Sequence, residues 1–176
     1  MLIMHVIVKV PEFSRIRLES ACNRLISHCY KHAFIEKNVF IQCCNSTYMI
    51  TEAENRDSFL GLIACRRIRS TDIHDHNLMR YHPQKYHAIY KIEALHYDKS
   101  IPLEKRAELI ETCLRDKNDS FVILECKCQN VLTDIEFLQS LGFDRGYSNK
   151  EKTVLVRAPR PPIKRTLRNI FKRKLK

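Results

Sequence analysis

Two ionisable residues, Glu93 and His96, stand three positions apart in a mainly apolar stretch, Tyr86 to Tyr97, that is predicted to be a strand. A carboxylate or an imidazole can take a proton from a substrate amine if it lies within hydrogen-bond reach and has a suitable pKa. Either residue is therefore a candidate general base. The alternative is that Glu93 is an ordinary strand-end carboxylate and His96 an exposed histidine, since such residues are common without function.

A second group of side chains has the chemistry of a metal site. The segment Asp72–His76 carries two aspartates and two histidines, and His82 follows it. His-x-His on an extended segment puts both rings on one side of the chain, and imidazole is a common ligand of transition metals. No spacing here matches a closed metal site, so the sequence favours a polar surface loop and we assign no metal ligand.

The eight cysteines are expected to be reduced. The first ten residues are apolar, but His5 and Lys9 interrupt them and Pro11 ends them, so they are too short for a signal peptide or a membrane span. This predicts an intracellular protein, in the cytoplasm or the nucleus, whose thiols stay free. We therefore interpret Cys126 and Cys128 as small buried hydrophobic residues.

The positive charge is concentrated at the C-terminus. The net charge is +11, and nine lysines and arginines with no acid lie from Arg157 to Lys176, which leaves about +2 for the rest. Ala158 to Pro162 is predicted to be an extended spacer. Residues 163–176 then show apolar residues at helical spacing among basic ones, as in a basic amphipathic helix. This tail could bind nucleic acid, an anionic membrane or an import receptor, or could be a disordered solubilising segment.

Apolar and β-branched runs alternate with segments of helical periodicity over the rest of the chain. A polar, histidine-rich loop, Ser70 to Lys85, interrupts the pattern. The predicted strands are Met4–Val10, Val39–Cys44, Thr47–Glu52, Phe59–Arg69, Tyr86–Tyr97, Phe121–Cys128, Arg145–Ser148 and Thr153–Arg157, and the predicted helices are Phe13–Glu36, one that starts near Ser100 and one that follows Asn130.

Residues 86–143 predict several local details. In the strand, Ile89 and Leu95 are expected on one face and the even-numbered residues from Ala88 to Ala94 on the other, so that both faces are covered. Ser100 is the expected N-cap of the next helix, with Pro102 in its first turn. The apolar stripe of that helix is predicted to be Leu103, Ala107, Ile110 and Leu114.

The last helix has signals at both ends. Thr133 and Glu136 fit a capping box, in which each side chain satisfies a free backbone N–H. Gly142 stands where the helix should stop, because a left-handed residue is favoured there. The segment after Phe143 is predicted to form a closing hairpin.

The order of these elements resembles the GNAT superfamily of N-acetyltransferases over about Met4 to Arg157. The most telling part is that Asn130 follows a central strand, a short helix comes next, and Leu141-Gly142-Phe143 ends it. Gly61 also stands where family members often carry a glycine in the third strand. The resemblance implies an α/β domain, residues 1–157, with a mixed central sheet flanked by helices on both faces, and a basic C-terminal tail, residues 158–176.

The resemblance also implies a binding site for acetyl-CoA. Leu95 and Tyr97 at the strand end, and Asn130, are implied as contacts of the cofactor. In the family, a loop that reads Gln/Arg-x-x-Gly-x-Gly/Ala holds the pyrophosphate with backbone N–H groups at a helix N-terminus. The residues implied for this loop and helix start are Lys99, Ser100, Ile101, Lys105 and Arg106.

The chain departs from the family pattern at two places. The stretch Asp98–Lys105 holds no glycine that would let the main chain approach the phosphates, and Pro102 removes an N–H donor. Asp98 and Glu104 add negative charge, which nearby basic residues could partly offset. Leu138 stands where many family members carry a tyrosine that gives a proton to the CoA thiolate.

Two functions follow as expectations. The first is transfer of an acetyl group from acetyl-CoA to an amine, for example of a protein, with Glu93 or His96 as the base. The second is a catalytically inactive relative that kept the fold as a binding module and acts through its basic tail on nucleic acid, an anionic membrane or a protein partner. The missing glycines and tyrosine favour the second function, while fold-level likeness favours the first.

Overall fold

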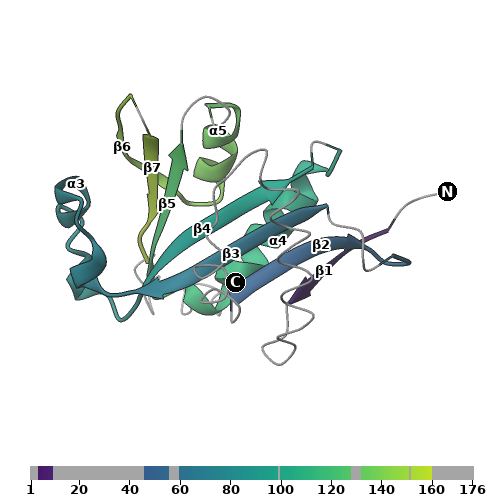
Figure 1. Ribbon diagram of the computed structural model, residues 1–176, viewed down its shortest axis with the longest axis horizontal. Coiled ribbons are helices and arrows are strands. Elements are labelled where there is room, and N and C mark those ends of the chain that lie inside the picture. Colours follow the sequence, from purple (N-terminus) through teal and green to yellow (C-terminus); the bar gives the residue numbers. More distant parts are fainter. Residues whose placement is uncertain are drawn as a thin grey trace, which may run out of the picture.

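The computed structural model describes residues 4–9, 46–55, 60–98, 100–127, 132–150 and 152–159, without the side chains of residues 127 and 132–134. Within these residues, seven strands form one mixed sheet in the order β1-β2-β3-β4-β5-β7-β6 (Figure 1). The strands are β1 His5–Lys9, β2 Thr47–Glu52, β3 Gly61–Ile68, β4 Ile89–Tyr97, β5 Phe121–Lys127, β6 Asp144–Ser148 and β7 Lys152–Arg157, and the helices are α3 His76–Met79, α4 Leu103–Leu114 and α5 Leu132–Ser140.

Every strand predicted within the described residues is confirmed. The least accurate bounds are the starts of β3 and β4, which the sequence placed at Phe59 and Tyr86. The polar loop predicted from Ser70 to Lys85 contains α3 and two 3₁₀ turns. The predicted helix Phe13–Glu36 and strand Val39–Cys44 lie outside the described residues, and the division of the chain after residue 157 stays a prediction.

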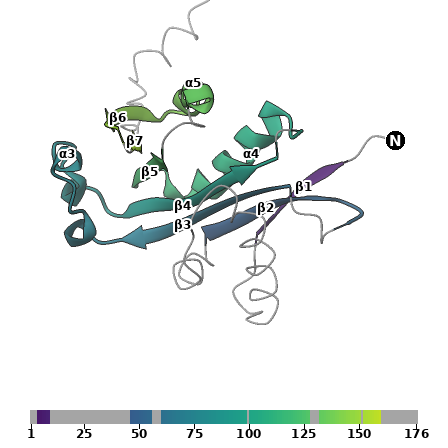
Figure 2. The same cartoon turned by 45° about the horizontal axis from the view of Figure 1, so that its top comes forward.

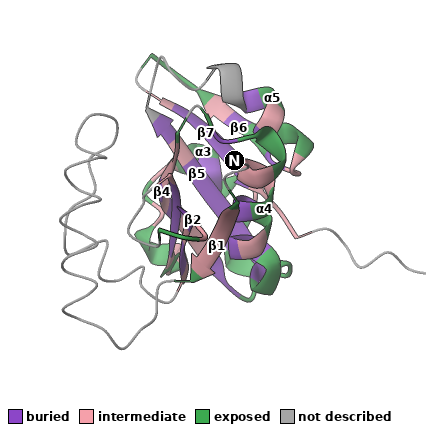
Figure 3. Cartoon of the chain, turned by 90° about the vertical axis from the view of Figure 1, so that its right-hand side faces the viewer, coloured by how far each residue is buried: buried purple, intermediate pink, exposed green. Residues whose placement is uncertain are grey.

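The sheet has a different cover on each face. α4 and α5 pack on one face over the larger apolar core, where α4 contacts β2 and β3, and Figure 2 shows α4 lying over the sheet. The segment that contains α3 covers part of the other face, where Leu78 packs with Ile89, Phe121 and Val154. In Figure 3 the buried residues gather where the strands meet α4 and α5. No described helix combines the length and apolarity that crossing a bilayer requires.

A β-bulge at Glu93 changes the alternation of side chains along β4. In the register with β3, Ala64 faces Ala94 but Cys65 faces Ile92, so Glu93 is the extra residue. Before the bulge, Ile89 packs in the core beside α3, and after it Leu95 packs in the core beneath α4. The prediction that Ile89 and Leu95 share a face was therefore wrong, because one extra residue reverses the two-residue period.

The start of α4 also differs from the prediction. The helix begins at Leu103 with Pro102 at the N-cap position, so Ser100 is not the cap. Leu103 is 54% exposed, whereas Ile101, just before the helix, is 1% exposed and belongs to the core. The buried face of α4 consists of Leu109, Ile110, Cys113 and Leu114, so the predicted stripe is confirmed at Ile110 and Leu114 and wrong at Leu103 and Ala107.

The last helix begins two residues earlier than the predicted cap implies and ends as expected. α5 starts at Leu132, so Thr133 lies inside the first turn and is not the predicted N-cap. At the other end Gly142 has a φ of 88°, the left-handed conformation that glycine adopts without strain. The N–H of Gly142 bonds the Gln139 carbonyl at 2.9 Å, and the N–H of Phe143 bonds the Leu138 carbonyl at 3.2 Å. These two bonds form a Schellman motif.

A pair of buried thiols joins α4 to the sheet. The Sγ atoms of Cys65 on β3 and Cys113 on α4 lie 3.4 Å apart, and neither is in a disulfide. The hydrogen bond with Cys65 lowers the pKa of Cys113 from its usual value. Beside them Lys117, only 3% exposed, donates to the Cys113 carbonyl at 2.6 Å and lies over the ring of Tyr90. Cys126 is also buried and outside any disulfide, which confirms for it the interpretation as a core residue.

Candidate functional site

The candidate site lies at the edge where β4 and β5 end. Among the described strands these two form the one parallel pair. Each is followed by a helix, so the carboxyl ends of two strands and the N-termini of α4 and α5 meet at the same edge. Ligands of open α/β sheets bind outside the carboxyl ends of such strands, and helix N-termini there favour negative groups.

The two strands separate before they end. Their ladder pairs Ile89–Ile92 with Phe121–Leu124 and stops, while β4 continues along β3 to Tyr97 and β5 continues along β7 to Lys127. Figure 1 shows the two strands fanning apart toward their carboxyl ends. The separation starts at the bulge residue Glu93. An extended ligand could lie between the strands and use main-chain groups, as in β-strand addition.

Glu93, the first candidate base, stands at the start of the separation but is held by an arginine. Nε and one Nη of Arg66 donate to its Oε1 at 3.0 and 2.8 Å, and Nζ of Lys91 lies 3.9 Å from Oε2. The Glu93 side chain is 12% exposed. Arg66 thus occupies Oε1 and Lys91 lies beside Oε2, so both oxygens of the carboxylate face a positive charge.

The Glu93 ion pairs belong to a longer chain of charges, here called the charged row. Glu125 on β5 lies 3.0 Å from Lys91 and 3.2 Å from Lys152 of β7. Lys152 also lies 3.5 Å from Asp75, which accepts a hydrogen bond from the Tyr147 hydroxyl. Partial burial alone would raise the pKa of Glu125, but Lys91 and Lys152 bring it below its usual value. Positive and negative groups alternate along the row, so each charge has a compensating neighbour.

Sequence reasoning missed the charged row because its members come from several separate segments. The available signal was the presence of Arg66, Lys91 and Glu125 inside otherwise apolar strands. The sequence raised Asp75 as a metal ligand and did not favour that role. In the structure Asp75 pairs with Lys152 in the charged row, and it caps α3 by accepting the Asn77 N–H at 3.0 Å. The described part of the chain holds no group of three or more side chains suited to a metal.

His96, the second candidate base, lies three residues beyond Glu93, where β4 still pairs with β3. It faces Leu62 in the register and is partly exposed. The structure thus places both sequence candidates on the part of β4 that has left β5. Their roles as bases stay predictions.

The loop between β4 and α4 is organised by Asp98. Its Oδ1 accepts the backbone N–H of Ser100 at 2.8 Å and the Ser100 hydroxyl at 2.7 Å. Its carbonyl accepts the N–H of Ile101 at 3.1 Å, and its own N–H donates to the Leu60 carbonyl at 2.7 Å. The two bonds from Ser100 lower the pKa of the Asp98 carboxyl below its usual value.

The basic residues implied for phosphate binding have other partners. Nε of Arg106 donates to the Ile101 carbonyl at 2.7 Å, and its guanidinium lies 4.7 Å from the ring centre of Tyr97. Nζ of Lys105 lies 2.6 Å from the Glu108 carboxylate. Two other implied contacts, Lys99 and Asn130, lie outside the described residues.

The two parts of the site fit an acyl-CoA unequally. The separated strands fit an extended arm. The loop does not fit a pyrophosphate, because the N–H groups of Ser100 and Ile101 both bond to Asp98 and Pro102 has none. Leu138, which replaces the tyrosine of many family members, is 2% exposed in the core and has no proton to give.

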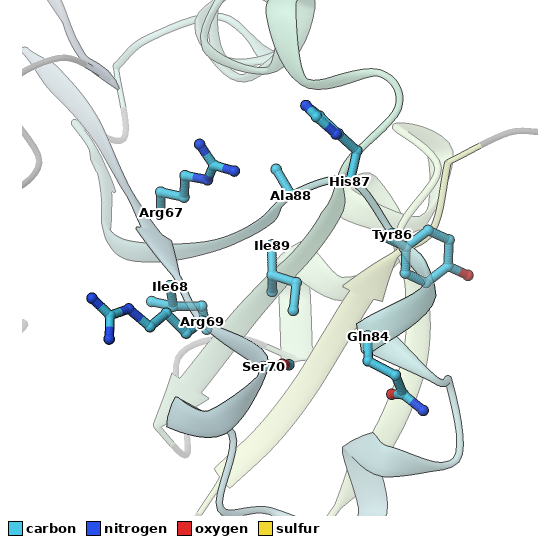
Figure 4. A pocket seen from close by; sticks show the side chains of 9 residues that line it. All are labelled: Arg67, Ile68, Arg69, Ser70, Gln84, Tyr86, His87, Ala88 and Ile89. Atoms are coloured by element: carbon cyan, nitrogen blue, oxygen red, sulfur yellow. The ribbon is translucent and has the colours of Figure 1, made fainter.

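A separate hollow of about 500 Å³ lies at the opposite end of β4, where β3 ends and β4 begins. Figure 4 shows that its polar side chains do not converge, since the Arg69 guanidinium and the Gln84 amide point to different sides. The hollow therefore lacks the directed polar groups of a ligand site. Its lining consists of Arg67, Ile68, Arg69, Ser70, Gln84, Tyr86, His87, Ala88 and Ile89.

Solved structures show which fold this is. The chain is similar to FeeM, an N-acyl amino acid synthase from uncultured soil microbes, at 12% identity and a TM-score of 0.63, covering 89% of this chain and 92% of that one. It is similar to Arabidopsis thaliana Naa50 at 13% identity and a TM-score of 0.60, covering 88% and 98%. It is also similar to a GNAT-family acetyltransferase from Listeria monocytogenes at 13% identity and a TM-score of 0.53, covering 87% and 94%.

The chain thus has the GNAT fold, as the order of its elements predicted, in a strongly divergent form. No family model and no curated protein matches its sequence. The predicted mixed sheet is confirmed in full over the described strands, and the basic tail beyond residue 159 lies outside them.

Proposed function

We propose that the protein is an N-acetyltransferase-like enzyme that accepts an acyl thioester of the acetyl-CoA type and passes the acyl group to an amine. The observation that carries this proposal is the separation of β4 and β5 after Ile92 and Leu124, at the edge where two helices begin. The separation offers main-chain groups of two strands to one extended arm. Such groups can hold a thioester in place without any special side chain.

The solved structures support this choice of ligand. Naa50 was solved with the bisubstrate analogue CoA-Ac-MVNAL, in which a CoA group and a peptide are joined. By analogy, we propose acetyl-CoA or a related thioester as the donor and an amine of a small molecule or a protein as the acceptor.

The proton of the acceptor amine needs a base near the strand separation. Glu93 and His96 are the proposed candidates. For Glu93 the charged row matters, because its Oε1 already accepts two hydrogen bonds from Arg66. An amine or ammonium group that enters beside Glu93 could take over part of the role of Arg66.

The test uses two donors and two readouts. The purified full chain is titrated calorimetrically with acetyl-CoA and with S-acetylpantetheine, and is then incubated with each donor and a mixture of peptides and small amines. We expect at least one donor to bind and acetylated amines to be found by mass spectrometry. Arg67→Ala, at the distant hollow, should leave both readouts unchanged, whereas Glu93→Gln should slow transfer and keep donor binding. The proposal is wrong if neither donor binds at millimolar concentration.

A second candidate function is a binding module without catalysis. It is favoured by Leu138, which has no proton to give, and by the ion-paired state of Glu93. Donor binding without any acetylated product, in the wild type and in Arg66→Ala alike, would support this second function over the first.

A further inference from the structure

We infer that Asp98 determines donor specificity: its carboxylate takes the place of a donor pyrophosphate at the start of α4, so the site favours thioesters that bring no pyrophosphate to this loop. The inference rests on the proposed function for the nature of the donor. The role of Asp98 as an internal substitute for an anion can be tested by itself.

The hydrogen-bond donors of Ser100 and Ile101 already have partners in this loop. A pyrophosphate at a helix start is held by successive backbone N–H groups of the loop. Here the N–H and the hydroxyl of Ser100 both point to one oxygen of Asp98, at 2.8 and 2.7 Å. The next N–H, that of Ile101, bonds the Asp98 carbonyl at 3.1 Å. An entering phosphate would have to displace Asp98 from all three donors.

The second step concerns the next residue along the loop. Pro102 offers no N–H, and its carbonyl already accepts the N–H groups of Lys105 and Arg106 at 3.0 and 3.1 Å. The loop therefore has no N–H donor at position 102 that could replace those bonded to Asp98.

The third step concerns charge. Asp98 is exposed and carries a negative charge at the position that a negative ligand would occupy. The two described basic residues at the helix start have other partners: Arg106 bonds the Ile101 carbonyl and stacks on Tyr97, and Lys105 pairs with Glu108. Asp98 thus repels a pyrophosphate, and the positive charges of Arg106 and His96 nearby act on the Asp98 carboxylate instead.

The experiment separates hydrogen bonding from charge. Asp98→Asn keeps an oxygen that can accept from Ser100 but removes the charge, and Asp98→Gly removes both. Inorganic pyrophosphate is titrated into the full chain, and the backbone amides of Ser100, Ile101 and Leu103 are followed by ¹⁵N NMR. We expect weak binding by the wild type, about tenfold tighter binding by Asp98→Gly, and an intermediate value for Asp98→Asn.

Asp119, exposed in the turn after α4, provides the matched control. Asp119→Asn and Asp119→Gly change the net charge equally but far from the loop, and should bind pyrophosphate as the wild type does. The inference is overturned if wild type and Asp98→Gly bind pyrophosphate equally, or if the Asp119 variants gain as much as the Asp98 variants. If Asp98→Gly fails to fold, Asp98→Asn and Ser100→Ala decide between the same outcomes.

A donor comparison then connects this result to the proposed function. Wild type should bind S-acetylpantetheine at least as tightly as acetyl-CoA, and Asp98→Gly should reverse the order. Because inorganic pyrophosphate carries no thioester, the first titration gives its answer even if neither donor binds. A failure of the proposed function is therefore distinguishable from a failure of this inference.

Discussion

The carboxylate of Asp98 accepts two hydrogen bonds from Ser100, and these bonds favour its charged form. At the scale of single residues, the same contacts explain how the N–H of Ser100 finds a partner in a loop without glycine. A glycine-rich loop leaves its N–H groups for a ligand, whereas a short acidic side chain satisfies them from within. The loop is therefore ordered by its own residues.

Ser100→Ala should raise the pKa of Asp98 toward the value of about 3.9 of an unperturbed aspartate, because one of its two hydrogen bonds is lost. In the wild type the pKa of Asp98 is lower in the folded than in the unfolded chain. The bonds therefore stabilise the fold above about pH 3.9, and this contribution is lost as the pH falls through the folded-state pKa. ¹³C NMR titration of the carboxyl checks the shift, and the pKa of Asp75, held by other partners, should not move.

At the scale of elements, the start of α4 is fixed by Ile101 rather than by a cap. Ile101 is fully buried before the helix begins, and no side chain caps the helix at Pro102. The end of α5 is fixed by backbone conformation, since Gly142 allows the two reverse hydrogen bonds that close the helix. One element is thus positioned by burial and the other by a left-handed residue.

Ile101→Ala should destabilise the protein by about 2–5 kcal/mol, as expected for a large side chain removed from a core. Leu103→Ala, two residues later and exposed, should cost under about 0.5 kcal/mol. Urea unfolding of both variants gives the comparison. Equal losses would mean that α4 buries Leu103, as the sequence pattern had indicated.

Gly142→Ala should cost about 1–2 kcal/mol, because a Cβ at a φ of 88° is strained. Gln139→Ala, on the exposed side of the same helix, serves as the control and should change the free energy of unfolding little. Thermal and urea unfolding measure both. A Gly142→Ala protein as stable as the wild type would show that the helix ends without the left-handed residue.

At the scale of the whole molecule, most of the net positive charge lies in the C-terminal part of the sequence. Acidic and basic residues nearly balance before Arg157, and the charged row shows how closely some of them pair inside the sheet. The excess lies in the C-terminal sequence. Contacts driven by overall charge should therefore depend on that sequence.

Deletion of residues 163–176 removes seven lysines and arginines and should abolish retention on heparin and on anionic vesicles. Ile170→Ser with Phe171→Ser keeps every charge, so it should keep heparin retention and weaken vesicle binding, which also needs apolar contact. Column retention over a salt gradient and vesicle sedimentation measure the two effects. Unchanged retention after deletion would assign the charge-driven contact to the folded body.

The sequence predicted the fold well because the signals of this fold are local. The strand-forming runs, Gly142 and the hairpin at Asn149 each act over a few residues, and the structure confirms all three. What the sequence could not predict depends on residues far apart in the chain. The bulge at Glu93 needs the register with β3, and the charged row needs five segments to meet.

The sequence predicted where the candidate site lies, but not which partners its side chains have. The order of elements placed the loop and both candidate bases at the end of β4. The sequence showed that Asp98–Lys105 holds no glycine and that Pro102 removes a donor, but not that Asp98 would bond Ser100. Nor did it show that Arg66 would hold Glu93, since that contact spans 27 positions.

The buried contact between Cys65 and Cys113 offers a way to measure how often α4 separates from the sheet. Both thiols are almost fully covered, so an alkylating reagent reaches them only when α4 lifts off the sheet. With excess reagent, the labelling rate of these two cysteines, resolved by peptide mass, measures how often that opening occurs. The same measurement in the presence of a donor would show whether binding at the strand edge slows the opening, with no assay for the reaction itself.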